Sequence, residues 1–327
     1  MTRYLAGRFG QSVLLVWLVL TLTFFLLHLA PGDPMARYDD PEMDPRAVLE
    51  MRRQFGLDRP VGEQYVRWMA SFAQGDFGTS LRYERPVSEL LFEAIPNTLR
   101  LTVAAFVVYI VLGVSIGLLS AAKKDTFTDR ASSVGSLLLY SIPSFWLALM
   151  LIMLFSLKLG LLPSSHMESI DAETLSGIAL LLDRLEHLVL PAFVLGVASA
   201  ASMARYMRGS MIDVLRQEYI RTARAKGLAE KRVLMKHALK NAAMPVVTIT
   251  GLSIPFLLGG AVVTEKIFSW PGMGLLMVES IYTRDYPVVL AVNFIVAVMV
   301  ILGNLLADLG YAALDPRVAL GRKGDRR

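Results

Sequence analysis

Six long runs of apolar residues constrain the fold of this 327-residue chain more than any other feature. They cover residues 9–30, 99–122, 135–159, 188–207, 244–264 and 288–309. A helix needs about 20 apolar residues to cross the hydrocarbon core of a bilayer, whereas buried helices of soluble domains have shorter apolar runs. Hydrophobic residues make up 54% of the chain. The sequence therefore predicts an all-α integral membrane protein with six transmembrane helices.

The first run resembles a secretory signal peptide in one respect, because Arg3 and Arg8 precede it. However, the run is longer than a typical signal-peptide core, and no Ala-x-Ala-like cleavage site follows it. We interpret residues 9–30 as an uncleaved first span, with His28 at the membrane interface.

Lysine and arginine in the connections predict the orientation of the spans. The segments 1–9, 122–135, 205–243 and 311–327 hold 2, 3, 10 and 5 basic residues, whereas the connections 158–187 and 265–287 hold 2 each. Basic residues concentrate on the cytoplasmic side of membrane proteins. We therefore expect both termini and the long basic loop to lie in the cytoplasm.

Four parts follow from this topology. Residues 1–30 form the N-terminus and the first transmembrane helix, and residues 31–98 form an extracytoplasmic segment. Residues 99–310 form the core transmembrane domain, which includes the basic loop 205–243, and residues 311–327 form a cytoplasmic tail.

The extracytoplasmic segment predicts two short helices. Asp44 and Pro45 are typical of a helix start, and Gly56 is typical of a helix end. A second, amphipathic helix follows, and we expect packing, more than membrane contact, for its apolar side, which consists of Val61, Tyr65, Trp68, Met69 and Phe72.

Prolines and small residues mark three of the core spans. Pro143 predicts an ordinary kink in the third span. Small residues in the fourth span, from Gly196 to Ser202, permit close helix contact. Gly251 and Pro255 make the fifth span irregular, which fits a helix that lines a route and fits simple packing almost equally well.

The basic loop carries ten basic residues against three acidic ones between residues 205 and 243. Ile212, Leu215, Tyr219 and Ala223 have helical spacing, and Gly227 then interrupts the pattern. This predicts a helix, a turn and a second helix. Attraction to anionic lipid explains the charge alone, whereas the small residues around Gly227 favour close approach by another protein.

Several short motifs are similar to one protein family. TARAKGL (222–228) and KHALKNAAMPV (236–246) resemble the cytoplasmic loop of binding-protein-dependent ABC permeases, with Arg221-Thr222-Ala223 in place of the usual Glu-Ala-Ala. Six further motifs match the same family: LHLAPGDP (27–34), GDFGTS (75–80), IPNTLRLT (95–102), IFSWPGMG (267–274), RDYP (284–287) and DPRV (315–318). In this order the motifs resemble the first permease subunit of dipeptide, oligopeptide and nickel importers.

The resemblance implies a subunit of a heteromeric importer in a bacterial or archaeal cytoplasmic membrane. Its partners would be a second homologous permease, two ATPase subunits or domains and an extracytoplasmic solute-binding protein, besides membrane lipid. The cargo implied is a di- or oligopeptide, with nickel chelates or another small solute as alternatives. The residues that would couple this chain to an ATPase are Arg221, Thr222, Ala223, Arg224, Ala225, Lys226 and Gly227.

The same resemblance places ATP and Mg²⁺ on the ATPase partners, and we expect no cofactor or metal in this chain. In agreement, the sequence lacks the G-x-x-x-x-G-K-[ST] motif that cradles phosphates, and it has no cysteine. We also expect no nucleic-acid partner.

Two other function classes fit less well. An intramembrane enzyme needs a nucleophile with a base or clustered metal ligands, but the four histidines are dispersed. An ion-coupled carrier usually places ionisable residues deep within its spans, and these spans are nearly uncharged at their centres.

Overall fold

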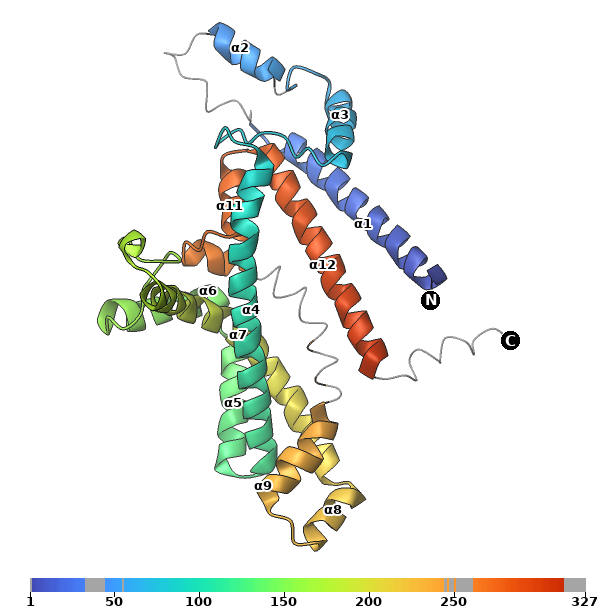
Figure 1. Cartoon of the computed structure of the whole chain (residues 1–327), viewed down its shortest axis with the longest axis vertical. Helices are drawn as coiled ribbons and strands as arrows, with labels where there is room; N and C mark the ends of the chain where they lie inside the picture. The colour runs from blue at the N-terminus through green and yellow to red at the C-terminus, as the bar shows by residue number, and fades with distance from the viewer. Residues whose placement is uncertain are drawn as a thin grey trace. The chain divides into compact units, whose positions relative to one another are not determined.

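A computed structural model describes residues 2–32, 45–54, 56–243, 246, 250 and 261–314 (Figure 1). The described residues form helices and no strand, apart from one isolated bridge between Thr79 and Pro86. The chain divides into two compact units. Unit 1 comprises Met1–Asn97 and Pro271–Met299, and unit 2 comprises Thr98–Trp270 and Val300–Arg327.

Unit 1 is built from helices that meet around one apolar core. It contains α1 (Thr2–Leu29), α2 (Pro45–Gln54), α3 (Val61–Ala73), the start of α4 (Val87–Ala122), α11 (Met273–Tyr282) and the start of α12 (Tyr286–Leu314). Its buried core joins Leu20, Phe72, Val87, Leu90, Leu91, Ala94, Met273, Val288, Ala291 and Val292.

The apolar side of α3 packs inward, as the sequence predicted. Trp68 stacks on Phe24 of α1 with 5.3 Å between ring centroids, and Phe72 is buried. The packing interpretation of Trp68 is therefore confirmed. Val61 departs from the pattern, since it lies in the first turn and remains 40% exposed.

Unit 2 contains the rest of α4, two short helices, a long central helix and the basic loop. The elements that follow α4 are α5 (Phe127–Ser141), α6 (Ser144–Leu151), the π-helix η2 (Ile152–Lys158), the 3₁₀ turn η3 (Ala172–Thr174), α7 (Ile178–Leu215), α8 (Glu218–Ala225), α9 (Glu230–Arg232) and the π-helix η4 (Val233–Ala238).

Two helices extend well beyond the apolar runs that predicted them. Helix α4 has 36 residues and begins at Val87, and α7 has 38 residues and begins at Ile178. Asp183, Arg184 and Glu186 lower the hydropathy of the first turns of α7, so the apolar run begins later. A helix needs only its backbone hydrogen bonds to continue, and apolar side chains are not required.

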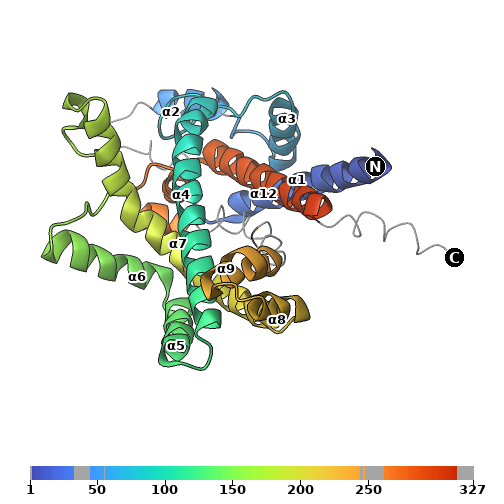
Figure 2. The ribbon, with the colours of Figure 1, turned by 60° about the horizontal axis from the view of Figure 1, so that its bottom comes forward.

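The third predicted span is broken rather than kinked. Helix α5 ends at Ser141, Pro143 precedes α6, and the two segments are bent by 103° (Figure 2). The expectation of an ordinary kink was therefore wrong. Proline removes a backbone donor and disfavours helical geometry at the preceding residue, and Ile142 has the extended ψ of 126° that this restriction favours.

Helix α7 is the centre of unit 2. Met203, Met207 and Met211 recur every fourth residue and are 0% exposed. A Cβ at Gly196 would lie 2.5 Å from the carbonyl oxygen of Ala105 in α4, and a Cβ at Gly117 would lie 2.6 Å from that of Ala204. Only glycine permits this contact, as the small residues of the fourth span predicted.

Four described helices are long and apolar enough to cross a membrane, and the bent pair of α5 with the continuous segment of α6 and η2 makes up to five. Of the predicted span 244–264 the structure describes only residues 246, 250 and 261–264. The tail motif at residues 315–318 and the start signal at Asp44 also lie outside the described residues. The count of six spans and their orientation remain predictions.

Candidate functional site

The basic loop forms the helix, turn and helix that the sequence predicted. Helix α7 ends at Leu215, and α8 begins at Glu218 with Gln217 at its N-cap. After the turn at Gly227 the chain continues through α9 and η4 (Figure 1). The helical face expected from Ile212 to Ala223 is interrupted at Arg216 and Gln217.

This interruption changes which residues of α8 are buried. Ile220 is 0% exposed and Ala223 is 6% exposed, whereas Tyr219 is 43% exposed. Ile220 and Ala223 belong to a cluster with Met207 and Met211, and the cluster also contains Val233, Ala238 and Ala242 beyond the turn. Tyr219, which shares the helical spacing of Ile212 and Ala223, is therefore not part of the buried face. We call the residues of this cluster on which Ile220 and Ala223 pack the α8 seat: Met207, Met211, Val233, Ala238 and Ala242.

The opposite side of α8 is open. Of the seven residues predicted to contact an ATPase, only Ala223 is buried, and the other six are exposed: Arg221, Thr222, Arg224, Ala225, Lys226 and Gly227. The helix therefore packs through Ala223 and presents a short exposed surface, half of whose residues are basic.

Gly227 ends α8 in the left-handed conformation, with φ +74°. Its N–H donates to the carbonyl of Arg224 at 2.9 Å, and the N–H of Leu228 reaches that of Ala223 at 3.4 Å. These two bonds form a Schellman motif, which satisfies the last carbonyls of a helix. A side chain at this φ is strained, so the turn depends on glycine.

An ion pair bridges the Gly227 turn. Arg224 donates to both carboxylate oxygens of Glu230, at 2.6 and 3.1 Å. The Arg224 guanidinium lowers the pKa of Glu230 below its ordinary value, although burial opposes this. Arg221 pairs with Glu218 at 2.8 Å. The Lys226 side chain makes no ion pair or hydrogen bond with any described residue.

A second contact fixes the helices around the α8 seat. Asp129 of α5 is 3% exposed and accepts two hydrogen bonds of 2.7 Å from Arg208 of α7. It also accepts from the hydroxyl of Ser120 in α4 and, at 3.0 Å, from the N–H of Asp125. One carboxylate thus connects three helices of unit 2.

Within unit 1 the contacts bring two of the sequence motifs together. Ser80, from GDFGTS, donates its hydroxyl hydrogen to Asp285 of RDYP, and the N–H of Arg82 donates to the same oxygen at 3.1 Å. Arg82 also pairs with Glu279 at 2.8 Å. In unit 2, Thr98 donates to the buried Glu265 at 2.7 Å.

Sequence reasoning missed these buried carboxylates. Each of them lies close to an apolar run, where a charged residue is usually an exposed residue at the end of a span. They are Asp129, Glu265 and Asp285. In the described part of the chain, no three His, Cys, Asp or Glu side chains are grouped in a way that could hold a metal ion.

Comparison with known families adds what the geometry alone does not give. A family described as "Binding-protein-dependent transport system inner membrane component" matches residues 113–320. Its N-terminal counterpart, "Binding-prot-dependent transport system membrane comp, N-term", matches residues 1–102. The chain belongs to this family. The permease is therefore a multi-pass inner membrane protein and a membrane component of a binding-protein-dependent ABC importer.

Curated relatives match the permease over nearly its whole length. An oligopeptide transport system permease, AppB, from Bacillus subtilis (strain 168) is 43% identical over 319 residues, which are 97% of this chain and 99% of the relative. A glutathione transport system permease, GsiC, from Salmonella paratyphi A is 39% identical over 318 residues, again 97% and 99%.

A solved structure shares the fold at low identity. The MetNI methionine ABC transporter, in an inward-facing conformation, matches with a TM-score of 0.56 and 18% identity over 69% of this chain and 96% of that chain. This likeness concerns the fold alone, and the role of Arg221 to Gly227 remains a prediction.

Proposed function

We propose that the permease forms half of the path through which an ATP-driven importer carries di- or oligopeptides. The observation that carries this proposal is the 43% identity, over 97% of the chain, to a permease named for oligopeptide transport. The relative named for glutathione transport supports the same class of cargo.

The assembly contains a second homologous permease, two ATPase subunits or domains and an extracytoplasmic solute-binding protein. This chain is a non-catalytic subunit, and ATP and Mg²⁺ bind to the ATPase partners. Each permease supplies one set of spans, and the binding protein delivers the peptide to the outer side.

In this assembly α8 and the turn that follows it dock on an ATPase through their exposed residues, while Ala223 packs on the α8 seat. The exposed residues are Arg221, Thr222, Arg224, Ala225, Lys226 and Gly227. The burial of Ile220 and Ala223 supports the proposal, since a helix packed on the bundle passes motion to it. Differential contact in the two states is required, because a partner shifts an equilibrium only by its preference between states.

Reconstitution of the complete importer in liposomes tests the cargo and the energy source. We expect ATP-dependent uptake of labelled di- and oligopeptides that requires the binding protein. Uptake driven by an ion gradient without ATP would show a secondary carrier, and uptake of nickel chelates with no peptide competition would exclude the peptide assignment.

Replacement of Gly227 tests the docking. Gly227→Leu forces a branched side chain into left-handed backbone, so we expect an inserted, assembled complex whose ATP hydrolysis no longer drives peptide uptake. Gly227→Asn is the matched control, because asparagine tolerates this conformation. Full transport by a well-assembled Gly227→Leu complex would refute the role of the turn.

A further inference from the structure

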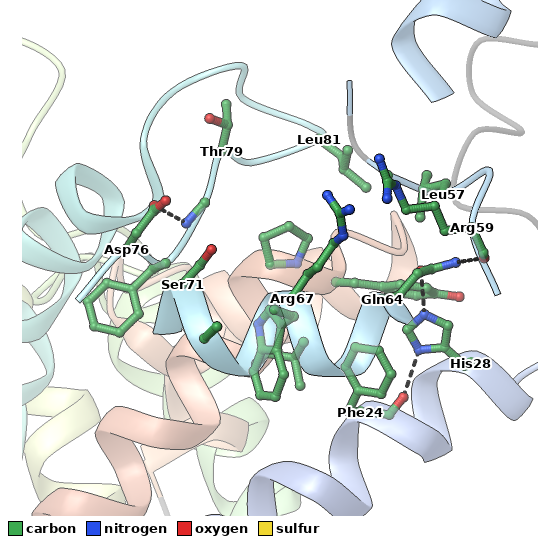
Figure 3. Close-up of a pocket in the computed structure, with 18 of the residues that line it drawn as sticks. Phe24, His28, Leu57, Arg59, Gln64, Arg67, Ser71, Asp76, Thr79 and Leu81 are labelled. Atoms are coloured by element: carbon green, nitrogen blue, oxygen red, sulfur yellow. Dashed lines mark hydrogen bonds between the residues drawn. The ribbon is translucent and has the colours of Figure 1, made fainter. Parts of the chain in front are cut away.

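A pocket of about 830 Å³ lies within unit 1 (Figure 3). It is lined by the end of α1, one side of α3, the connection between α2 and α3, the loop 76–81 and the first turns of α12. Its volume is in the range of sites that hold small molecules.

The pocket lies at the depth where two spans leave the hydrocarbon. Phe24 and His28 come from the last turns of α1, whose apolar stretch ends at Leu29. Tyr286 and Leu290 come from the first turns of α12, whose apolar stretch begins at Tyr286. The rings of His28 and Tyr286 are 5.3 Å apart. Lipid headgroups occupy this level of a bilayer.

Aromatic rings supply the apolar part of the lining. Phe24, Trp68, Phe77 and Tyr286 all line the pocket, and Phe24 and Trp68 are stacked on each other. Such an apolar surface can contact the first methylene groups of a lipid acyl chain, next to its ester linkage to glycerol.

Three arginines supply the charge. Arg53, Arg59 and Arg67 line the pocket, and the described lining contains only one acidic residue, Asp76. Asp76 is engaged by its own turn, since its Oδ1 accepts the N–H of Gly78 at 2.9 Å. The lining thus carries an excess of positive charge.

The arginines are arranged to receive an anion. Glu63 Oε1 lies 2.5 Å from Arg59 and 3.1 Å from Arg67, which draws the two guanidinium groups together. Each guanidinium has five N–H donors, so both keep donors for a ligand. The Arg53 side chain makes no ion pair or hydrogen bond with any described residue.

Residues 31–98 contain eight arginines and no lysine. Arginine presents a planar fork that binds phosphate in a bidentate manner, whereas lysine acts as a single point charge. The choice of cation in this segment therefore favours recognition of a phosphate or carboxylate over simple solubility.

Hydrogen bonds hold one wall of the pocket in place. Figure 3 shows the His28 ring between Phe24 and Gln64, with its Nδ1 2.8 Å from the Phe24 carbonyl and its Nε2 3.1 Å from Gln64 Oε1. The Gln64 amide donates in turn to the carbonyl of Arg59 at 2.8 Å. This chain of contacts ties α1 to α3 and to the backbone that carries Arg59.

We propose that this pocket binds an anionic phospholipid. The phosphate contacts Arg53, Arg59 and Arg67, and the start of one acyl chain lies against Phe24 and Trp68. Three features of the pocket coincide: its position at the ends of two spans, its aromatic rings and its arginines. An anionic phospholipid is a ligand that uses all three. The proposal does not depend on the cargo or on the docking of α8.

The test uses the complete importer in phosphatidylcholine nanodiscs that contain increasing fractions of phosphatidylglycerol. Bound lipid is counted by native mass spectrometry. We expect selective retention of phosphatidylglycerol and about a fivefold loss of retention in Arg53→Gln, the effect of one basic residue at an anionic membrane surface. Arg59→Gln with Arg67→Gln should lose more.

Arg85→Gln is the matched control, since Arg85 belongs to the same segment but pairs with Glu89 and Glu93 outside the pocket lining. Equal retention of phosphatidylcholine, or retention unchanged in Arg53→Gln, would overturn the proposal. So would equally strong binding of glycerol 3-phosphate, which carries the phosphate without a chain, or displacement of the lipid by a short acidic peptide. Because the Arg53 side chain makes no ion pair or hydrogen bond with any described residue, its variant remains decisive if the double variant misfolds.

Discussion

Asp129 illustrates what single residues contribute beyond the sequence pattern. A lone aspartate in the first turn of a helix fits a favourable interaction with the helix dipole, which is an exposed role. In unit 2 it is instead buried and connects α4, α5 and α7 through Ser120 and Arg208. No local pattern connects residues 129 and 208, so this contact emerges only with the fold.

Removal of the Asp129 charge should destabilise the permease. In Asp129→Asn, Arg208 loses its partner in a site where the carboxylate is 5% and the arginine 31% exposed. We expect a loss of about 3 kcal/mol, the lower end for a broken buried pair. The midpoint of denaturant unfolding at fixed detergent concentration measures it.

Glu93→Gln is the control for that measurement, because Glu93 pairs with Arg85 while 63% exposed. Exposed pairs contribute at most about 1 kcal/mol. Equal losses in the two variants would contradict the structural role of Asp129.

The Arg224–Glu230 pair should respond to acid and not to physiological pH. The folded-state pKa of Glu230 is lowered, so the contribution of the pair is present above the unfolded pKa, about 4.3, and is lost as pH falls through the folded value. Both side chains are about half exposed, so the contribution is small.

Hydrogen exchange of residues 223–228 checks this, with Glu230→Gln compared at each pH. The extra protection of the unmodified chain should stay constant from pH 8 to 6 and decrease below about pH 4. A decrease between pH 8 and 6 would assign the protection to another group.

At the scale of helices, the sequence predicted which segments are helical better than where they break. Gly227 signalled the end of α8 because few residues adopt its conformation. The break at Arg216 and Gln217 has no glycine or proline. It coincides with the packing of Ile220 and Ala223 on the seat, which is a tertiary contact. Pro143 signalled a disturbance, but not its angle, since neighbouring helices set the direction of a broken span.

The close contact of α4 and α7 leads to a prediction about glycine. In Gly196→Ala the new methyl group meets the backbone of Ala105, which cannot rotate away. We expect destabilisation of about 1–3 kcal/mol, the usual range for overpacking.

Gly135→Ala in α5 provides the comparison, since a Cβ there meets nothing within 4 Å. Alanine favours a helix over glycine, so this variant should be neutral or slightly stabilised. The measurement is the unfolding midpoint of each variant. A Gly196→Ala protein as stable as Gly135→Ala would refute the close contact between α4 and α7.

At the scale of the whole chain, the apolar runs predicted a multi-pass membrane protein, the basic loops predicted its orientation, and the motif resemblance supplied the permease assignment. The contact of Asp129 with Arg208 places the turn after α4 and the end of α7 at one end of unit 2. Thr98 and Glu265 meet at the other end of the part of α4 that belongs to unit 2. Charge counting had assigned residues 122–135 and 205–243 to one side of the membrane, and Asp129 and Arg208 of these two segments are in contact. The side of the membrane itself remains a prediction.

The orientation can be measured by cysteine labelling, since the chain contains no cysteine. We expect Lys124→Cys and Lys226→Cys to react with an impermeant maleimide only after permeabilisation. Ile170→Cys, at a fully exposed position, should react in intact spheroplasts. Labelling of Lys226→Cys from outside would reverse the predicted orientation.

Two contacts with α7 show how far apart two later residues of unit 2 lie along this helix. The carbonyl of Ala242 accepts a hydrogen bond from Ser210, whereas Ala261 packs in one cluster with Leu195. Ser210 and Leu195 are 15 residues apart on one helix, which is about 22 Å. Residues 242 and 261 therefore lie about 22 Å apart along the direction of α7, which is most of the hydrocarbon thickness of about 30 Å.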